Sequence, residues 1–143
     1  MIGTDELFLD WYTAAKEQAV ILNRIINYNG FNNNAHVLDC ACGIGTQAIG
    51  LVALGYQVTA SDISDGELID AKASVEKHGF TIRFEHADFR ALSDILEQFD
   101  IVIAMDNALP HMLTIEALES ALRSIIGKIR KGGIHKDTRL FYH

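Results

Sequence analysis

The stretch from Val37 to Ala48 constrains the fold of this chain more than any other. A short β-prone run ends at Asp39, a loop of small residues follows, and a helix is expected from about Gly45. Small residues let the backbone come close to a ligand, and the start of a helix offers unpaired N–H groups. Asp62 ends the next apolar run and is suited to accept hydrogen bonds from both hydroxyls of a ribose. The sequence therefore predicts a nucleoside-binding half-site.

The rest of the chain continues this alternation of strand and helix. The expected strands are His36 to Asp39, Tyr56 to Ala60, Thr81 to His86 and Asp100 to Ala104. The expected helices are Leu7 to Ile26, Gly45 to Leu54, Ser64 to Gly79, a short one at Leu92 to Leu96, and Ile115 to Arg130. This order predicts an α/β fold, a doubly wound, Rossmann-like and mostly parallel sheet with flanking helices.

Two sequence features concern the ends of the expected helices. Ser64 and Glu67 form the capping-box pattern at the start of one helix, and Asn29-Gly30 predicts a left-handed turn at the end of the first. After Gly133 the pattern calls for a fifth strand, but there only residues 140–142 are apolar. We therefore expect a single domain over residues 1–143 that lacks the last strands and is incomplete at its C-terminus.

Length and charge exclude several classes of protein. A chain of 143 residues corresponds to one domain, and a net charge of −7 argues against binding to a nucleic-acid backbone. No apolar run is long enough to span a membrane, and no signal peptide is evident at the start. The two cysteines, Cys40 and Cys42, form no CxxC pair, which argues against a metal site. Reduced thiols used as small apolar residues favour a cytoplasmic protein.

The motif Asp39-x-Ala41-x-Gly43-x-Gly45, with Asp62, Asp88 and the Asp100–His111 segment, resembles the class I S-adenosylmethionine-dependent methyltransferases. Within that class, residues 38–46 and the Asn-Ala-Leu-Pro-His run at 107–111 are most similar to the glycine/sarcosine N-methyltransferase-like group. The pair at residues 10–11 fits this group too, and the resemblance extends almost to residue 133. It implies an enzyme that binds S-adenosylmethionine and moves a methyl group to a small-molecule acceptor, an amine, leaving S-adenosylhomocysteine.

The resemblance also assigns roles to individual residues. Contacts with the cofactor are expected from Trp11, Asp39, Ala41, Gly43, Gly45, Asp62, Ile63, Asp88, Phe89 and Met105. Asn107 and His111 would face the methyl acceptor as catalytic residues, and His111 or Asp106 could accept a proton from an amine. Ala41 and Asp106 each stand where many members of the class have glycine.

Two other interpretations stay open at this stage. Gly43-x-Gly45-x-x-Ala48 with Asp62 also satisfies the dinucleotide fingerprint, which is typical of NAD-dependent oxidoreductases. Asp39 and the loop at residues 107–111 favour methyl transfer, and that loop lacks the Pro-Pro-aromatic run of DNA amino-methyltransferases. Alternatively, the chain is a truncated domain that binds cofactor without turnover, or one that needs a partner to cover its open sheet edge, as a homodimer would.

Overall fold

The computed structural model describes residues 4–88, 91–92, 95–104, 115–130 and 139–142. Its helices are α1 (Thr4–Tyr28), α2 (Thr46–Ala53), α3 (Asp65–Lys77) and α4 (Ile115–Ile126). Its strands are β1 (His36–Asp39), β2 (Gln57–Asp62), β3 (Arg83–His86), β4 (Ile101–Ala104) and β5 (Arg139–Tyr142). The strands form one sheet in the order β3-β2-β1-β4-β5, in which every neighbouring pair is parallel. The predicted fold class is confirmed.

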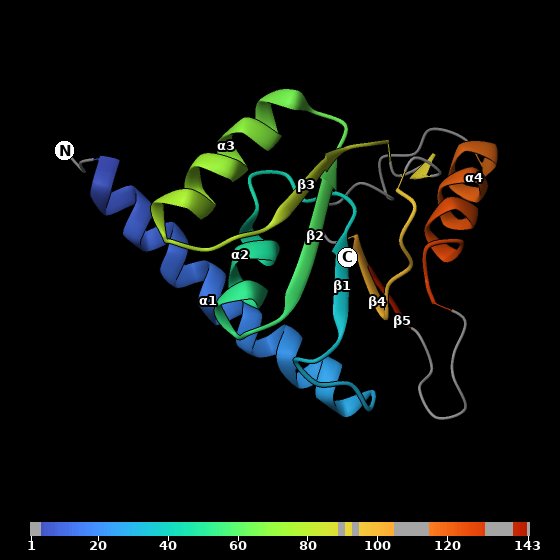
Figure 1. Ribbon diagram of the computed structural model, residues 1–143, viewed down its shortest axis with the longest axis horizontal. Helices are drawn as coiled ribbons and strands as arrows, with labels where there is room; N and C mark the ends of the chain where they lie inside the picture. The colour runs from blue at the N-terminus through green and yellow to red at the C-terminus, as the bar shows by residue number, and fades with distance from the viewer. Residues whose placement is uncertain (1–3, 89–90, 93–94, 105–114, 131–138, 143) are drawn as a thin grey trace.

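Helices cover both faces of the sheet, as a parallel sheet requires. In Figure 1, α1, α2 and α3 lie on one side of the sheet and α4 lies on the other. Successive residues of β1 point to opposite faces: Val37 packs in the layer that includes residues of α1 to α3, and Leu38 packs in the layer beneath α4. Two apolar layers therefore hold β1 at the centre, and its carboxyl end is fixed.

The contact between α1 and α2 is close enough to require glycine. A Cβ added at Gly50 would lie 2.5 Å from the carbonyl oxygen of Ala15 and 2.8 Å from the Cβ of Ala19. Ala15 and Ala19 are fully buried at this crossing. Small residues on both helices thus bring the two backbones together, and α1 fixes the position of the helix that follows the glycine loop.

Several boundaries differ from the sequence prediction because of contacts distant in sequence. The helix predicted to reach Arg130 ends at Ile126, because the following residues bridge to Phe99: Phe99 N donates to Lys128 O, and Arg130 N donates to Phe99 O. Strand β2 extends past its predicted end at Ala60, since Ser61 and Asp62 pair with β3. Strand β3 in turn begins at Arg83 rather than Thr81.

The short helix predicted at Leu92–Leu96 is also wrong for the described part of that segment. Leu92 has 3₁₀ geometry, but no helix continues through residues 95–98. Leu92 N donates to the Ser124 hydroxyl of α4, and Lys128 donates to the Ile95 carbonyl oxygen. A side chain of α4 and one from the residues after it therefore satisfy these two backbone groups without a helix.

The turns and the last strand agree better with prediction. Gly30 has φ +88°, as the expected left-handed turn requires. The fifth strand that the pattern calls for after Gly133 forms around the short apolar run at residues 140–142, since β5 pairs with β4 from Arg139 opposite Ile101 to Tyr142 opposite Ala104. Among the described helices, none is long and apolar enough to cross a membrane.

Candidate functional site

The loop after β1 is anchored to both neighbouring strands. Cys40 N donates to the carbonyl oxygen of Ile103 in β4, and Cys42 N donates to the carbonyl oxygen of Ser61 in β2, each at 3.0 Å. Gly43 and Gly45 have φ values of +54° and +91°, in the left-handed region that side chains with a Cβ rarely adopt. The loop therefore turns sharply at the two glycines and leads directly into α2.

Asp62 joins this loop to the end of β2. Its Oδ2 accepts a hydrogen bond from Gly43 N at 2.8 Å, and its Oδ1 accepts one from Ser64 N at 2.9 Å. A carboxylate oxygen carries two acceptor sites, so both oxygens retain capacity for further donors such as ribose hydroxyls. The carboxylate thus holds the two turns together and still lies beside the glycine loop.

The capping box predicted at Ser64 forms only in half. The Ser64 hydroxyl accepts a hydrogen bond from Glu67 N at 3.2 Å, as expected for an N-cap. The Ser64 N–H, which Glu67 would bind in a full box, donates to Asp62 instead. Asp62 therefore binds the Ser64 N–H in place of the Glu67 side chain.

Asp39 and the two cysteines are buried within this framework. Asp39 is 1% exposed at the end of β1. Burial, with the Asp39 charge as a smaller cause, raises the pKa of the Cys40 thiol far above its usual range, so this thiol stays neutral. Cys40 packs in the layer beneath α4 and Cys42 in the opposite layer, and both are free thiols. They act as small apolar residues at the turn.

Trp11 reaches the site from α1. Its indole Nε1 donates to the Thr46 hydroxyl at 2.9 Å, and the ring packs half-buried against the core. Thr46 is the first residue of α2, directly after the N-cap Gly45, which has no side-chain cap. The tryptophan therefore contacts the helix that begins at the glycine loop. Thr46 was absent from the predicted set; its position at the start of α2 is the signal that could have identified it.

Ile63 and Asp88 lie where neighbouring strands end. Ile63 is 56% exposed, and its backbone carbonyl oxygen lies 2.8 Å from His86 Nε2. Ala87 N donates to the carbonyl oxygen of Asp62, which aligns the segment after β3 with the end of β2. Asp88, half-buried, follows directly. His86, which carried no predicted role, supports the Ile63 backbone.

The structure thus gathers most of the predicted cofactor residues at the carboxyl ends of the strands. Asp39, Ala41, Gly43, Gly45, Asp62, Ile63 and Asp88 all lie at or just after the carboxyl ends of β1, β2 and β3. Phe89, Met105, Asp106, Asn107 and His111 lie outside the described residues. Among the described residues, no group of three His, Cys, Asp or Glu side chains could hold a metal ion.

The carboxyl ends of the strands, where these residues gather, are the usual ligand-binding side of doubly wound sheets. The chain goes from β1 outward to β2 and β3, and then returns to β4 on the other side of β1. Ligands of such sheets bind outside the carboxyl ends of the strands at this switch point. Positive-φ glycines, a helix start and a carboxylate at the end of β2 fit a nucleoside cofactor. Fold and site define a nucleoside-binding α/β domain.

Comparison with known proteins identifies the family. Residues 37–133 match the model of the methyltransferase domain family, so the chain belongs to this family. The resemblance to class I S-adenosylmethionine-dependent methyltransferases, seen in the glycine loop and Asp62, is confirmed.

The similar proteins differ in their acceptors. A glycine/sarcosine N-methyltransferase of Aphanothece halophytica is 27% identical over 131 residues, covering 91% of this chain and 48% of the relative. A ubiquinone biosynthesis O-methyltransferase of Methylocella silvestris is 34% identical over 98 residues, covering 68% and 37%. An S-adenosylmethionine-dependent methyltransferase of Clostridium acetobutylicum has the same fold, with a TM-score of 0.72 at 20% identity over 85% of this chain and 48% of its own. The chain spans about half the length of the curated relatives it matches.

Proposed function

We propose that this chain is the cofactor-binding part of an S-adenosylmethionine-dependent methyltransferase whose acceptor is a small-molecule amine. The observation that carries the proposal is the bond between Asp62 and Gly43, which brings a ribose-binding carboxylate against the turn of the glycine loop. Family membership supports the cofactor, and the N-methyltransferase relatives support the amine.

In this proposal each group of residues binds a different part of the cofactor. The loop from Asp39 to Gly45 lies along the methionine part, Asp62 accepts from the ribose hydroxyls, and the exposed Ile63 side chain covers one adenine face. Asp88 and Phe89 receive the adenine edge, and Met105 offers backbone contacts. No side chain has to form a covalent bond, because the cofactor supplies an activated methyl group on a sulfonium.

The protein's contribution to the reaction is therefore orientation and proton removal. Holding a nucleophile in line with the methyl group can lower the barrier by about 7–11 kcal/mol in favourable cases. An amine must be neutral to attack, so His111 or Asp106 accepts its proton, and Asn107 orients it. Replacing His111 and Asp106 together is expected to slow turnover and to leave cofactor affinity intact.

The test is transfer of a radiolabelled methyl group from S-adenosylmethionine to a panel of small acceptors. Amines of the glycine type form one arm, and phenols and other hydroxyl compounds form the other, because some relatives are O-methyltransferases. Labelled amines would support the proposal. Label confined to hydroxyl compounds would refute the acceptor class, and absence of any transfer despite cofactor binding would mark the chain as a binding domain without turnover.

A binding signal is available within the chain for the same assay. Trp11 is its one tryptophan, and the indole N–H donates to the first residue of α2. Occupation of the glycine loop is therefore expected to change the intrinsic fluorescence. A Trp11→Phe variant, which removes the one tryptophan of the chain, is the control for the origin of the signal.

A further inference from the structure

Strand β3 forms one edge of the sheet and has β2 as its neighbour. Within the described residues no strand lies on its outer side, so half of its backbone N–H and C=O groups face outward. The strand is short, and its side chains alternate in character. Arg83 and Glu85 lie on one face, and Phe84 lies on the other, where it packs against the core beneath α3. Such an edge can accept another strand.

We propose that β3 is the seam of a homodimer, in which two copies join edge to edge as antiparallel strands about a two-fold axis at Phe84. An antiparallel pairing centred on this residue sets Arg83 opposite Glu85 of the second copy, and Glu85 opposite Arg83 of the second copy. A two-fold interface needs a self-complementary surface, and opposite charges directly across the strands supply it. Within one copy Arg83 Nε donates to Glu85 Oε1 at 2.9 Å, so in the dimer each of these side chains would exchange or share this partner with the second copy. The two side chains are 52% and 34% exposed, which leaves both within reach of a second copy.

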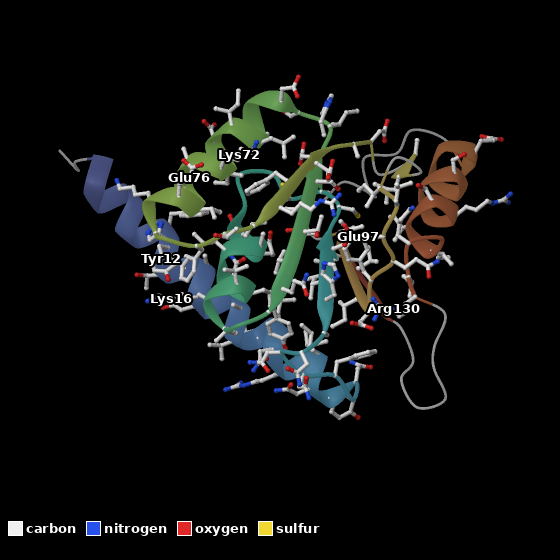
Figure 2. All side chains as sticks on the ribbon, in the orientation of Figure 1. Tyr12, Lys16, Lys72, Glu76, Glu97 and Arg130 are labelled. Atoms are coloured by element: carbon white, nitrogen blue, oxygen red, sulfur yellow. The ribbon has the colours of Figure 1, made fainter. Side chains whose placement is uncertain are left out.

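The outer flank of α3 has the same self-complementary order. Lys72 and Glu76 stand one helical turn apart, and Ile69, which is 66% exposed, shares their stripe. In Figure 2, Lys72 and Glu76 lie on α3 on one side of β3, and Glu97, which pairs with Arg83, lies on the other side. Two antiparallel copies of α3 would bring each Lys72 toward Glu76 of the second copy.

The spacing of the elements allows the strands and the helices to meet together. Helix α3 packs over both β2 and β3. With strands about 4.8 Å apart, joining the two β3 edges places the two α3 axes about 10 Å apart. Packed helices are separated by about 8–10 Å. The paired strands and the paired helices therefore fit one interface.

A shallow depression next to β3 supplies an apolar contact at the centre. It has a volume of about 170 Å³ and is lined by Lys72, Val75, Glu76, Phe80, Thr81, Ile82 and Phe84. Since directly opposed residues of paired strands point to the same face, Phe84 of the second copy would enter the depression beside Phe84. Because the two copies run antiparallel, the carboxyl ends of their β1 strands would point in opposite directions and not into the seam. Neither cofactor site would therefore be blocked.

The pairing predicts a charge-exchange result that few other interfaces would give. In a dimer of the Arg83→Glu variant, the new glutamate of each copy faces Glu85 of the other copy, which gives two Glu–Glu pairs. In a dimer of the Glu85→Arg variant, the new arginine of each copy faces Arg83 of the other copy, which gives two Arg–Arg pairs. Each single variant is expected to weaken dimerisation by roughly tenfold or more, because two cross-strand pairs become repulsive. An equimolar mixture of the two variants restores opposite charges in every pair, as does the double variant Arg83→Glu/Glu85→Arg.

Sedimentation equilibrium over a wide range of concentration is the measurement, with the circular dichroism melt as a check on folding. Arg24→Glu, on the exposed surface of α1, makes the same charge change outside β3 and α3 and is the control. The expected result is a dimeric wild type and control, weakened single variants, and a restored mixture. A wild type that stays monomeric, or single variants that dimerise like the control, would overturn the proposal; so would a mixture that stays as weak as its components.

Discussion

The Asp62 carboxylate is expected to hold the glycine loop in place before any ligand arrives. It accepts N–H groups from Gly43 at 2.8 Å and from Ser64 at 2.9 Å, distances typical of hydrogen bonds to a charged oxygen. Asp62→Asn keeps one carbonyl oxygen and turns an NH₂ group toward the other backbone donor. One charge-assisted bond is therefore lost, at a cost of about 1.5–3 kcal/mol in the free energy of unfolding.

That loss corresponds to a measurable change in melting temperature. For a chain of this size, 1 kcal/mol shifts Tm by about 3 °C, so the variant should melt about 5–9 °C lower. Differential scanning calorimetry of the ligand-free protein measures the shift. The affinity for S-adenosylhomocysteine should fall by roughly tenfold or more, because the ribose hydroxyls then meet a neutral acceptor.

Asp65→Asn is the matched control, since it makes the same chemical change three residues later. Its side chain is 79% exposed in the first turn of α3. The lost interaction with the helix dipole is worth about 0.3–1 kcal/mol, a shift of at most about 3 °C. Equal melting temperatures for the two variants would refute the reasoning that Asp62 holds the loop.

Three further expectations concern the rest of the fold. Gly50→Ala puts a Cβ 2.5 Å from a backbone oxygen of α1 and should lower the free energy of unfolding by about 1–3 kcal/mol, measured with urea. Gly66→Ala is the control and should lower it much less, because the nearest neighbour of its Cβ is 3.8 Å away. Equal losses would argue against close contact between α1 and α2. Burial lowers the pKa of His36 below its ordinary value of about 6.5. Its contribution to the free energy of unfolding should therefore be fully present above about pH 6.5 and be lost as the pH falls from there through the lower pKa of the folded state. A His36→Gln variant with an unchanged slope of stability against pH would contradict this. Cys40 and Cys42 are buried, so Ellman's reagent should label the folded protein slowly and the denatured chain fast, and fast labelling without denaturant would count against the packing.

Local patterns made most of the fold predictable. The apolar runs at β1 and β4 have the character of strands covered on both faces, and the left-handed glycine at Gly30 ends α1 near its predicted end. The glycine loop and Asp62 were predictable for a similar reason: small residues after one strand and a carboxylate at the end of the next are local sequence signals. The bonds that join them to each other and to β2 and β4 are long-range.

The errors lie where tertiary contacts decide a local structure. Residues after Ile126 have helical periodicity, but Phe99 offers them backbone partners that no local rule predicts. The Glu67 capping role was lost for a similar reason, since Asp62 already accepts the Ser64 N–H. Thr46 was missed because its partner, Trp11, is 35 residues away in sequence. The predicted acceptor residues, Asn107 and His111, stay predictions.

Calorimetric titration with S-adenosylhomocysteine, compared with NAD, tests the central claim most directly. Both ligands carry an adenosine that the Asp62 carboxylate could hold, so the comparison separates the two classes of protein that share the glycine-loop pattern. The account predicts binding of S-adenosylhomocysteine, weakened by Asp62→Asn and not by Asp65→Asn, and no competition by NAD. Binding of NAD in place of S-adenosylhomocysteine would contradict it.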